Sequence, residues 1–261
     1  MIISALKSSD PKDLRSPIHQ DTISALVNLG VEIFFEHGIG EGIFTSDKDF
    51  ESLGLQSSTR EYCIANSDLV ISNQPLSSDE VKSMKSGATL LGMVNPFSNQ
   101  ELINCCAESN INLVSMEFIP RITRAQKMDV LSSQANLAGY SAVIESARHL
   151  STALPMMMTA AGTLKPARVF IIGVGVAGLQ AIATAKRLGA RVEAFDTRDV
   201  VEEQVNSLGA KFVKIDLGET GQTDQGYAKE LTPEQIIKQK DLQSEVCARS
   251  DIVITTAQLF G

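Results

Sequence analysis

The sequence predicts an α/β protein with two parallel sheets, each covered by helices. Three observations predict this fold class. Short apolar runs alternate with amphipathic stretches along the chain, as expected for parallel strands connected by helices. The length of 261 residues is sufficient for two domains. In the second half, a glycine-rich turn at residues 173–178 joins a β-branched run to an alanine-rich stretch, which is typical of a strand followed closely by a helix.

Four apolar runs in the first half predict strands, at residues 31–35, 69–72, 89–94 and 112–116. Amphipathic stretches predict further helices, at residues 21–29, 58–66, 78–85 and 99–108. The pairs Ser77-Ser78 and Ser98-Asn99 favour helix starts, because their side chains accept hydrogen bonds from unpaired amides. We therefore expect an N-terminal α/β domain over residues 1–124.

Residues 125–160 are predicted to connect the two domains. One long helix is expected over residues 125–150, with small side chains facing a packed neighbour, although Gly139 weakens it. Pro155 and the run Met156–Met158 follow. Because methionine adapts to irregular gaps, we expect these three side chains to fill part of a core.

The second half repeats the alternation and predicts a dinucleotide-binding domain of the Rossmann type over residues 161–261. Strands are expected at residues 169–172, 191–195, 211–215 and 251–255, and helices at residues 176–188, 200–208 and 233–249. Gly189 ends the first of these helices, and Thr232-Pro233-Glu234 begins the last. A complete fold of this type has six strands, so we expect this second Rossmann-like sheet to be truncated after its fourth strand.

The glycine-rich turn predicts a dinucleotide site. In this Gly-x-Gly-x-x-Gly pattern, Gly173 permits the tight turn, Gly175 lets a pyrophosphate approach the backbone, and Gly178 lets helix and strand pack closely. The start of the following helix supplies amide donors and a partial positive charge. A glycine-rich turn without any ligand is the alternative interpretation.

Asp196 ends the second strand of this half, at the spacing that the dinucleotide pattern requires. A carboxylate there accepts hydrogen bonds from ribose hydroxyls and repels a 2′-phosphate, so NAD is favoured over NADP. Arg198 keeps an alternative open, because an arginine near this position can hold a 2′-phosphate. The same side chain could instead stack near the adenine or pair with Asp199 or Glu202.

Composition and charge exclude several function classes. The formal net charge of −8 argues against a nucleic-acid surface, which concentrates lysine and arginine. The four cysteines form no C-x-x-C pair, so we expect no metal site, and a reducing compartment is the simplest interpretation. The apolar stretch at residues 169–185 is interrupted by glycines and divides into a strand and a helix, so no membrane span is predicted.

Beyond the glycine turn, specific segments of the sequence resemble a known family. Residues 168–199, read with Pro120-Arg121-Ile122-Thr123-Arg124-Ala125-Gln126-Lys127-Met128-Asp129, resemble the NAD(H)-binding domain of the α subunit of proton-translocating NAD(P) transhydrogenase. The wider family includes alanine dehydrogenase. Further similar segments lie at residues 131–140, 194–198, 226–229 and 254–257. The resemblance covers nearly all of the chain and is strongest after Pro120.

The resemblance implies catalytic roles for Arg121, Gln126 and Asp129, in a segment that orients the nicotinamide and its ribose. The amide of Gln126 offers both the donor and the acceptor that a carboxamide needs. Other cofactor contacts in this part of the chain are implied for Lys127, Met128 and Ser132.

The remaining implied cofactor contacts lie in the second half. Those at the pyrophosphate are Gly173, Gly175, Val176, Ala177 and Gly178. Those at the adenosine ribose are Asp196, Thr197 and Arg198. Gly226 and Tyr227 correspond to a mobile loop, at residues 217–231, that closes over the nucleotide. Thr256 and Ala257 are the last of the implied contacts.

The resemblance implies an enzyme, the α subunit of NAD(P) transhydrogenase. NADH would bind to this chain, and hydride would pass to NADP⁺ on a partner subunit, coupled to proton translocation across a membrane. The implied partners are the NADP-binding and membrane subunits and a second copy in a homodimer. The implied location is cytoplasmic and peripheral to a bacterial inner membrane, or at the matrix face in a mitochondrion.

Two other functions stay open: a free-standing NAD-dependent oxidoreductase similar to alanine dehydrogenase, and a non-catalytic NAD-binding regulator. Against the first, Ile71 stands where family members commonly have a lysine, and no histidine lies near residues 93–96, where alanine dehydrogenases place a catalytic one. The end of the chain also departs from the family, with Ala257-Gln258-Leu259-Phe260-Gly261 in place of the usual Leu-Ile-Pro-Gly.

Overall fold

The computed structural model describes residues 1–120, 122–214 and 231–257. The chain divides into two compact units, Met1–Asp129 and Val130–Gly261, which are described separately below. The division lies inside the predicted connecting segment of residues 125–160, and the three-part domain scheme stays a prediction. Three predicted site residues lie outside the described residues: Arg121, Gly226 and Tyr227.

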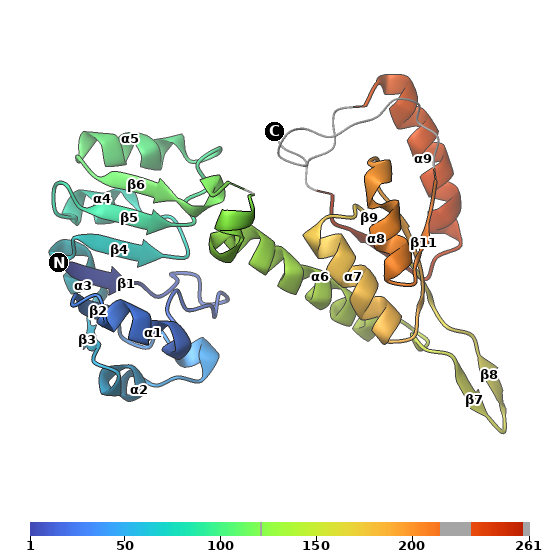
Figure 1. Ribbon diagram of the computed structural model, residues 1–261, viewed down its shortest axis with the longest axis horizontal. Helices are drawn as coiled ribbons and strands as arrows, with labels where there is room; N and C mark the ends of the chain where they lie inside the picture. The colour runs from blue at the N-terminus through green and yellow to red at the C-terminus, as the bar shows by residue number, and fades with distance from the viewer. Residues whose placement is uncertain (121, 215–230, 258–261) are drawn as a thin grey trace. The chain divides into compact units, whose positions relative to one another are not determined.

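The first unit is built on a six-stranded sheet in the order β3-β2-β1-β4-β5-β6, in which every neighbouring pair is parallel (Figure 1). The strands are β1 Ile2–Ala5, β2 Glu32–Glu36, β3 Gln56–Ser58, β4 Leu69–Ser72, β5 Thr89–Gly92 and β6 Asn112–Ser115. The four predicted strands are confirmed, with small shifts at their ends. β1 and β3 were not predicted; β3 contains only polar residues and therefore shows no apolar periodicity.

The helices of the first unit are α1 Gln20–Val27, α2 Asp47–Ser52, α3 Arg60–Asn66, α4 Ser78–Ser83 and α5 Gln100–Glu108, with 3₁₀ turns η1 Glu41–Ile43, η2 Met116–Phe118 and η3 Thr123–Met128. Two predicted helix starts are confirmed: Ser77 caps α4, and the Asn99 side chain accepts from the Leu102 amide at the start of α5. The helix predicted at residues 58–66 begins later, because Thr59 is its cap and the preceding residues pair as β3.

Helices cover both faces of the first sheet. Along β2, Ile33 and Phe35 pack into the core that contains Ile23 of α1, whereas Phe34 packs on the opposite face with Ile64 of α3. Alternate residues of one strand point to opposite faces, so the sheet is buried on both sides. The predicted α/β class is thereby confirmed for this half of the chain.

The second unit contains a four-stranded parallel sheet in the order β11-β10-β9-β12. Its strands are β9 Arg168–Ile172, β10 Arg191–Phe195, β11 Lys211–Phe212 and β12 Ile252–Thr255, and its helices are α6 Val130–His149, α7 Val176–Arg187, α8 Glu202–Ser207 and α9 Pro233–Ala248, with η4 Asp199–Val201 before α8. All four predicted strands are confirmed, although β11 ends at Phe212 and is shorter than the predicted strand over residues 211–215. Numbered by their order along the chain, the strands of this sheet are arranged 3-2-1-4, which matches four of the six positions in the 3-2-1-4-5-6 order of a dinucleotide-binding fold.

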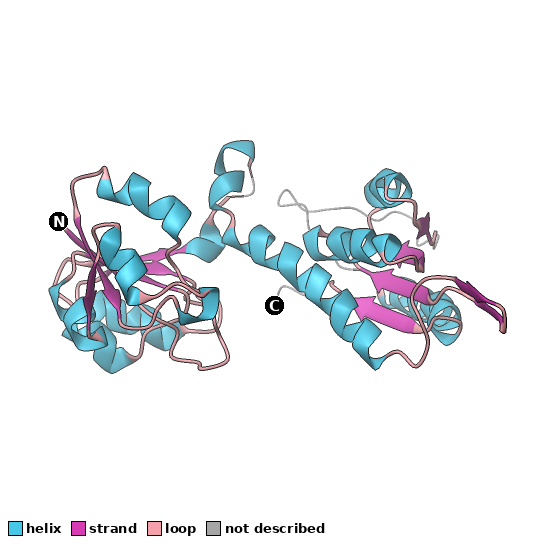
Figure 2. Ribbon diagram, turned by 90° about the horizontal axis from the view of Figure 1, so that it is seen from below, coloured by secondary structure: helices cyan, strands magenta, loops and turns pink. Residues whose placement is uncertain are grey.

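Helices lie on both sides of the sheet in this unit as well (Figure 2). Val169 and Ile171 of β9 face a core shared with Val143 of α6 and Ala181 of α7. On the other face, Phe170 packs with residues that include Val246 of α9. The carboxyl end of β9, where the glycine-rich turn begins, therefore lies at the centre of a sheet that is buried on both faces.

The methionine run does not fill a core, and that prediction is wrong. β7 Met157–Thr159 and β8 Gly162–Leu164 form a two-stranded antiparallel hairpin that projects from the second unit (Figure 1). Met156, Met157 and Met158 are exposed by 57%, 48% and 75%. A two-stranded hairpin has no second layer to bury its side chains, so methionine at these positions stays in contact with solvent.

The long helix α6 packs against α7, with Gly139 and Val143 as its buried residues; not all of its small residues face this neighbour as predicted, since Ala138 is exposed. It begins at Val130 rather than at residue 125, because residues 123–128 form the 3₁₀ turn η3. Gly139 is the closest point of the packing: a Cβ added there would overlap the carbonyl oxygen of Ala177. Gly139 thus brings the backbone of α6 against the first turn of α7, which carries the glycine pattern.

We expect Gly139→Ala to lower the free energy of unfolding by about 1–3 kcal/mol, because the two helix backbones must separate to admit the methyl group. A loss of stability would be informative, because alanine inside a helix is intrinsically more favourable than glycine by about 1 kcal/mol and should otherwise raise the free energy of unfolding. Urea denaturation measures the change. Asn136→Ala, on the exposed side of the same helix, is the control and should be neutral or slightly stabilising. A Gly139→Ala variant as stable as the wild type would contradict the close approach.

Candidate functional site

The three pattern glycines of the second unit occupy different environments. Gly173 has φ of 94°, in the left-handed region that favours glycine, and a Cβ there would lie 2.7 Å from the Ala257 amide nitrogen. A Cβ on Gly178 would overlap the Gly173 carbonyl oxygen, whereas a Cβ on Gly175 would meet nothing within 4 Å. Two of the glycines therefore permit close packing of the protein, and Gly175 faces open space.

The start of α7 offers unpaired backbone donors beside that space. Gly175 is the N-cap of α7 and makes no side-chain capping hydrogen bond. The helix continues for 12 residues to Arg187, so its dipole places a partial positive charge at this end. Amide donors, positive potential and an open backbone approach together suit a phosphate group.

The end of β12 ties the turn to the rest of the sheet. The Thr256 hydroxyl donates to the Gly173 carbonyl oxygen at 2.8 Å, and the Thr256 amide donates to the Ile172 carbonyl oxygen at 2.8 Å. Ala257 follows directly, next to Gly173. Thr256 and Ala257 thus lie beside the glycine turn, where the sequence analysis expected cofactor contacts.

Asp196 fixes the conformation of the turn from the end of β10. Its Oδ2 accepts a hydrogen bond from the Val174 amide at 2.7 Å, and its Oδ1 accepts from the Arg198 amide at 2.9 Å. The Gly173 amide donates to the Phe195 carbonyl oxygen at 2.9 Å. Val174 was not among the predicted site residues. It occupies one of the variable positions of the glycine pattern and contacts Asp196 through its backbone amide.

Arg198 forms a bidentate ion pair with Asp196. Its Nε lies 2.9 Å from Oδ1 and its Nη2 lies 2.8 Å from Oδ2, and Nη2 also donates to the Val174 carbonyl oxygen at 3.2 Å. The two side chains are only 16% and 7% exposed. Asp199 and Glu202 were predicted as candidate partners of Arg198, whereas in the structure the guanidinium pairs with Asp196. Thr197 lies between the paired residues and is partly buried.

The ion pair determines the ionisation of Asp196. Burial alone would raise the pKa of this carboxyl, but the hydrogen bonds from the Arg198 side chain and the Val174 amide outweigh burial and lower the pKa below its ordinary value. The same contact with Asp196 raises the pKa of Arg198. Asp196 is therefore negatively charged at neutral pH, and the charge of Arg198 is largely neutralised by its neighbour.

We expect Asp196 to stabilise the second unit above about pH 4 and to lose this effect in acid. Because the folded pKa is the lower one, the unfolded chain binds the proton more readily, and the stabilisation disappears as the pH falls through the folded pKa. Urea denaturation of the wild type and Asp196→Asn, at steps from neutral pH downward, measures the difference in unfolding free energy. That difference should shrink with acid, and a constant difference would contradict the assignment.

The predicted nicotinamide segment lies in the first unit. Gln126, Lys127 and Met128 are exposed residues of the 3₁₀ turn η3, and the Asp129 amide closes it by donating to the Gln126 carbonyl oxygen at 3.3 Å. Ser132 lies in the first turn of α6, in the second unit. The structure thus gathers the predicted pyrophosphate and ribose residues in the second unit, whereas residues 126–129 belong to the first unit.

Within the described residues, no helix combines the length and apolarity that crossing a membrane requires. The chemistry of the site at the glycine turn rests on backbone amides, one buried carboxylate and one guanidinium.

Two family models match the chain: residues 6–138 match the N-terminal domain of alanine dehydrogenase/PNT, and residues 142–261 match the C-terminal domain of alanine dehydrogenase/PNT. The first part of the NAD(P) transhydrogenase α subunit from Rhodospirillum rubrum is 44% identical over 269 residues, covering 100% of this chain and 70% of the relative. Its counterpart from Rickettsia prowazekii is 42% identical, with the same shares covered. The crystal structure of transhydrogenase from Sinorhizobium meliloti is similar with a TM-score of 0.86 and 41% identity, over 99% of this chain and 70% of that one.

Proposed function

The chain belongs to the alanine dehydrogenase/PNT family of oxidoreductases, and from this premise we propose that it is the NAD(H)-binding component of an NAD(P) transhydrogenase. One observation carries the proposal: a glycine turn with an open side at Gly175, held by the buried carboxylate of Asp196 at the end of the next strand. This turn stands at the carboxyl edge of a parallel sheet, where open α/β folds bind their ligands.

The backbone of the turn suits the pyrophosphate of the dinucleotide. The amides of Val176 and Ala177 begin α7 and need acceptors. Gly175 leaves room for a close approach, and Gly178 keeps the helix start against β9. Val176 is exposed by 41%, so the approach to the helix terminus is open.

The ion pair supports NAD(H) over NADP(H). Asp196 is charged at neutral pH and repels a 2′-phosphate, and Arg198 is already neutralised by it. The four hydrogen bonds to Asp196 use about all the acceptor positions of a carboxylate. A ribose hydroxyl would exchange for only one of the two side-chain hydrogen bonds from Arg198, so that the guanidinium stays paired with Asp196 and is not free to hold a 2′-phosphate. Thr197, next to both, is assigned to the same ribose.

The nicotinamide end is assigned by matching position in the family. Arg121, Gln126 and Asp129 would orient the nicotinamide and its ribose, with Lys127, Met128 and Ser132 beside them. Thr256 and Ala257 would line the cofactor near the turn, and Gly226 and Tyr227 would close over it. When bound, the reduced nicotinamide supplies a hydride for NADP⁺ held on a partner subunit. The task of this chain is to hold and aim the ring, because hydride transfer depends on positioning and needs no general base here.

We further assign this chain to a transhydrogenase whose NADP-binding and membrane subunits couple hydride transfer to proton translocation. A homodimer and a place at the cytoplasmic face of a bacterial inner membrane, or at the matrix face in a mitochondrion, belong to the same proposal. The support for them is the similarity to the α-subunit relatives.

A reconstitution assay tests the proposal. The chain alone should bind NADH at least about tenfold more tightly than NADPH, which corresponds to about 1.4 kcal/mol. Hydride transfer from NADH to an NADP⁺ analogue should appear only when the NADP-binding subunit is added. Oxidation of NADH with pyruvate and ammonia, without any partner, would instead indicate an alanine dehydrogenase. Nucleotide binding without turnover in the presence of the partner would indicate a regulator.

A further inference from the structure

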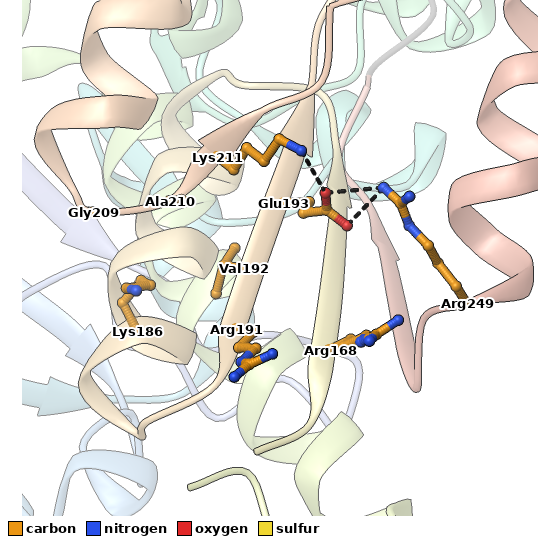
Figure 3. Close-up of a pocket in the computed structure, with 9 residues that line it drawn as sticks. All are labelled: Arg168, Lys186, Arg191, Val192, Glu193, Gly209, Ala210, Lys211 and Arg249. Carbon is orange, nitrogen blue, oxygen red and sulfur yellow. Dashed lines mark hydrogen bonds and ion pairs between the residues drawn. The ribbon is translucent and has the colours of Figure 1, made fainter. Parts of the chain in front are cut away.

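The second unit contains a cavity of about 490 Å³ whose lining is dominated by cations (Figure 3). The cationic residues are Arg168, Lys186, Arg191, Lys211 and Arg249. Three of them begin the strands β9, β10 and β11, so the cavity lies at the amino ends of the sheet. The glycine turn follows the carboxyl end of β9. The two sites are therefore at opposite edges of one sheet.

Two arginines of the cavity occupy paired positions on neighbouring strands. Arg168 of β9 is the register partner of Arg191 of β10, and Figure 3 shows both side chains at the foot of these strands, with their guanidinium groups extending to different sides. Like charges directly opposite each other in a sheet are destabilising. The nearby Asp251 carboxylate accepts from the main-chain amide of Arg168 at 2.7 Å. Across the described ranges of the chain, no ion pair of either guanidinium with a carboxylate is found.

Glu193 is the acidic residue of the lining, and its carboxylate is already paired with two of the cations. Arg249 Nη2 lies 2.9 Å from each Glu193 oxygen, and Lys211 Nζ lies 3.7 Å from Oε1. Figure 3 shows these contacts as the dashed lines on one side of the cavity. Lys186, like the two paired arginines, forms no ion pair within the described part of the chain. The cavity thus concentrates positive charge in a chain whose formal net charge is −8.

We propose that this cavity is a second anion site, which binds a multiply charged phosphate. Its volume falls in the range of small-ligand pockets, about 300–1,000 Å³. The planar guanidinium groups of Arg168 and Arg191 present donor pairs that match phosphate oxygens. Three cations without a carboxylate partner suit several phosphate charges better than a single carboxylate. A bound anion would also reduce the repulsion between the charges of Arg168 and Arg191.

The phosphate belongs either to a free polyphosphate compound or to a lipid headgroup.

Calorimetric titration with inorganic tripolyphosphate tests the site on the full chain. It is performed at about 50 mM salt, since higher salt screens exposed charges, and with saturating NADH to occupy the glycine turn. We expect one saturable site. Arg191→Ala should weaken its affinity about tenfold, the size of a lost charge-assisted contact. Lys186→Ala should also weaken the affinity about tenfold. Because Lys186 lies on α7 and not on a strand, this substitution does not disturb the register of the sheet.

Matched controls separate a site from general charge effects. Arg187→Ala removes the same charge from the exposed residue next to Lys186, outside the cavity, and should leave the affinity unchanged. Glu193→Gln should strengthen binding, because it frees Arg249 and Lys211, whereas Glu203→Gln on the exposed face of α8 should not. The absence of saturable binding would overturn the proposal, as would equal losses in Arg187→Ala and Arg191→Ala. Tripolyphosphate binding that is found without NADH, disappears at saturating NADH and is unchanged in Arg191→Ala would also overturn it.

Vesicle sedimentation then identifies the source of the phosphate. The vesicles consist of phosphatidylcholine with added phosphatidic acid. A lipid headgroup is identified if the chain binds these vesicles, if tripolyphosphate reverses the binding, and if Arg191→Ala abolishes it. Tripolyphosphate binding without vesicle binding identifies a soluble polyphosphate. NADH affinity is measured in parallel and should be the same in Arg191→Ala and the wild type, so that failure of this site is distinguishable from failure of the dinucleotide site.

Discussion

Gly178→Ala is expected to weaken NADH binding at least about a hundredfold, the equivalent of about 3 kcal/mol or two charge-assisted hydrogen bonds. The added methyl group would overlap the Gly173 carbonyl oxygen and would lie 3.0 Å from Thr256 Oγ1. Because the obstructing atom is backbone, α7 must move away from β9, and its amide donors move with it. The free energy of unfolding should fall as well. Fluorescence titration with NADH and urea denaturation measure the two effects.

Gly175→Ala provides the matched control for this experiment. A Cβ at Gly175 meets no protein atom within 4 Å, and its φ of −89° suits any residue. The variant should therefore unfold like the wild type. It should still bind NADH more weakly, because the methyl group occupies the side from which the pyrophosphate approaches. If Gly175→Ala bound NADH as tightly as the wild type, the pyrophosphate would not contact this turn.

Asp196→Asn is expected to produce the second large effect, a loss of about 2–4 kcal/mol in the free energy of unfolding. Removing one partner of a largely buried ion pair leaves the other charge uncompensated, and here the stranded group is Arg198, only 16% exposed. The amide also presents donors where Arg198 donates. NADH affinity should fall at least about tenfold, since the hydrogen bond to Val174 that shapes the turn is weakened.

The second variant in this set removes both charges. Asp196→Asn combined with Arg198→Gln should recover part of the lost stability, because no unpaired charge remains. Asp199→Asn carries the same charge change at an exposed neighbouring position and should be close to neutral. Equal effects of Asp196→Asn and Asp199→Asn on unfolding would show that the Asp196–Arg198 pair does not hold the turn.

The elements that sequence patterns predicted well are those with a strong local signal. β9, α7 and β10 follow from a β-branched run, a glycine pattern and a second apolar run, and their bounds differ little from the predicted ones. The Thr232 cap and Pro233 placed the start of α9 correctly. The resemblance to the transhydrogenase and alanine dehydrogenase family is also confirmed, by the two family models and by a relative that is 42% identical over the whole chain.

The errors fall where the local signal was weak or ambiguous. β3 contains no apolar residue, and it forms a strand because the neighbouring β2 supplies its hydrogen bonds. The methionine run was predicted to be buried, because apolar composition does not reveal whether a second layer exists. At Met158, which is 75% exposed, no such layer covers the hairpin.

By itself the sequence predicted the α/β class, the glycine-rich turn between a strand and a helix, and Asp196 at the end of the next strand with Arg198 close behind it. These follow from local requirements: a positive φ, a close helix–strand approach, a carboxylate at the end of the next strand. Only the tertiary structure decided that Arg198 pairs with Asp196, that Gly139 admits the carbonyl of Ala177, and that Arg168 lies opposite Arg191. The physical reason is that such contacts depend on strand order, register and helix packing, which join residues distant in the chain and leave no periodic trace in it.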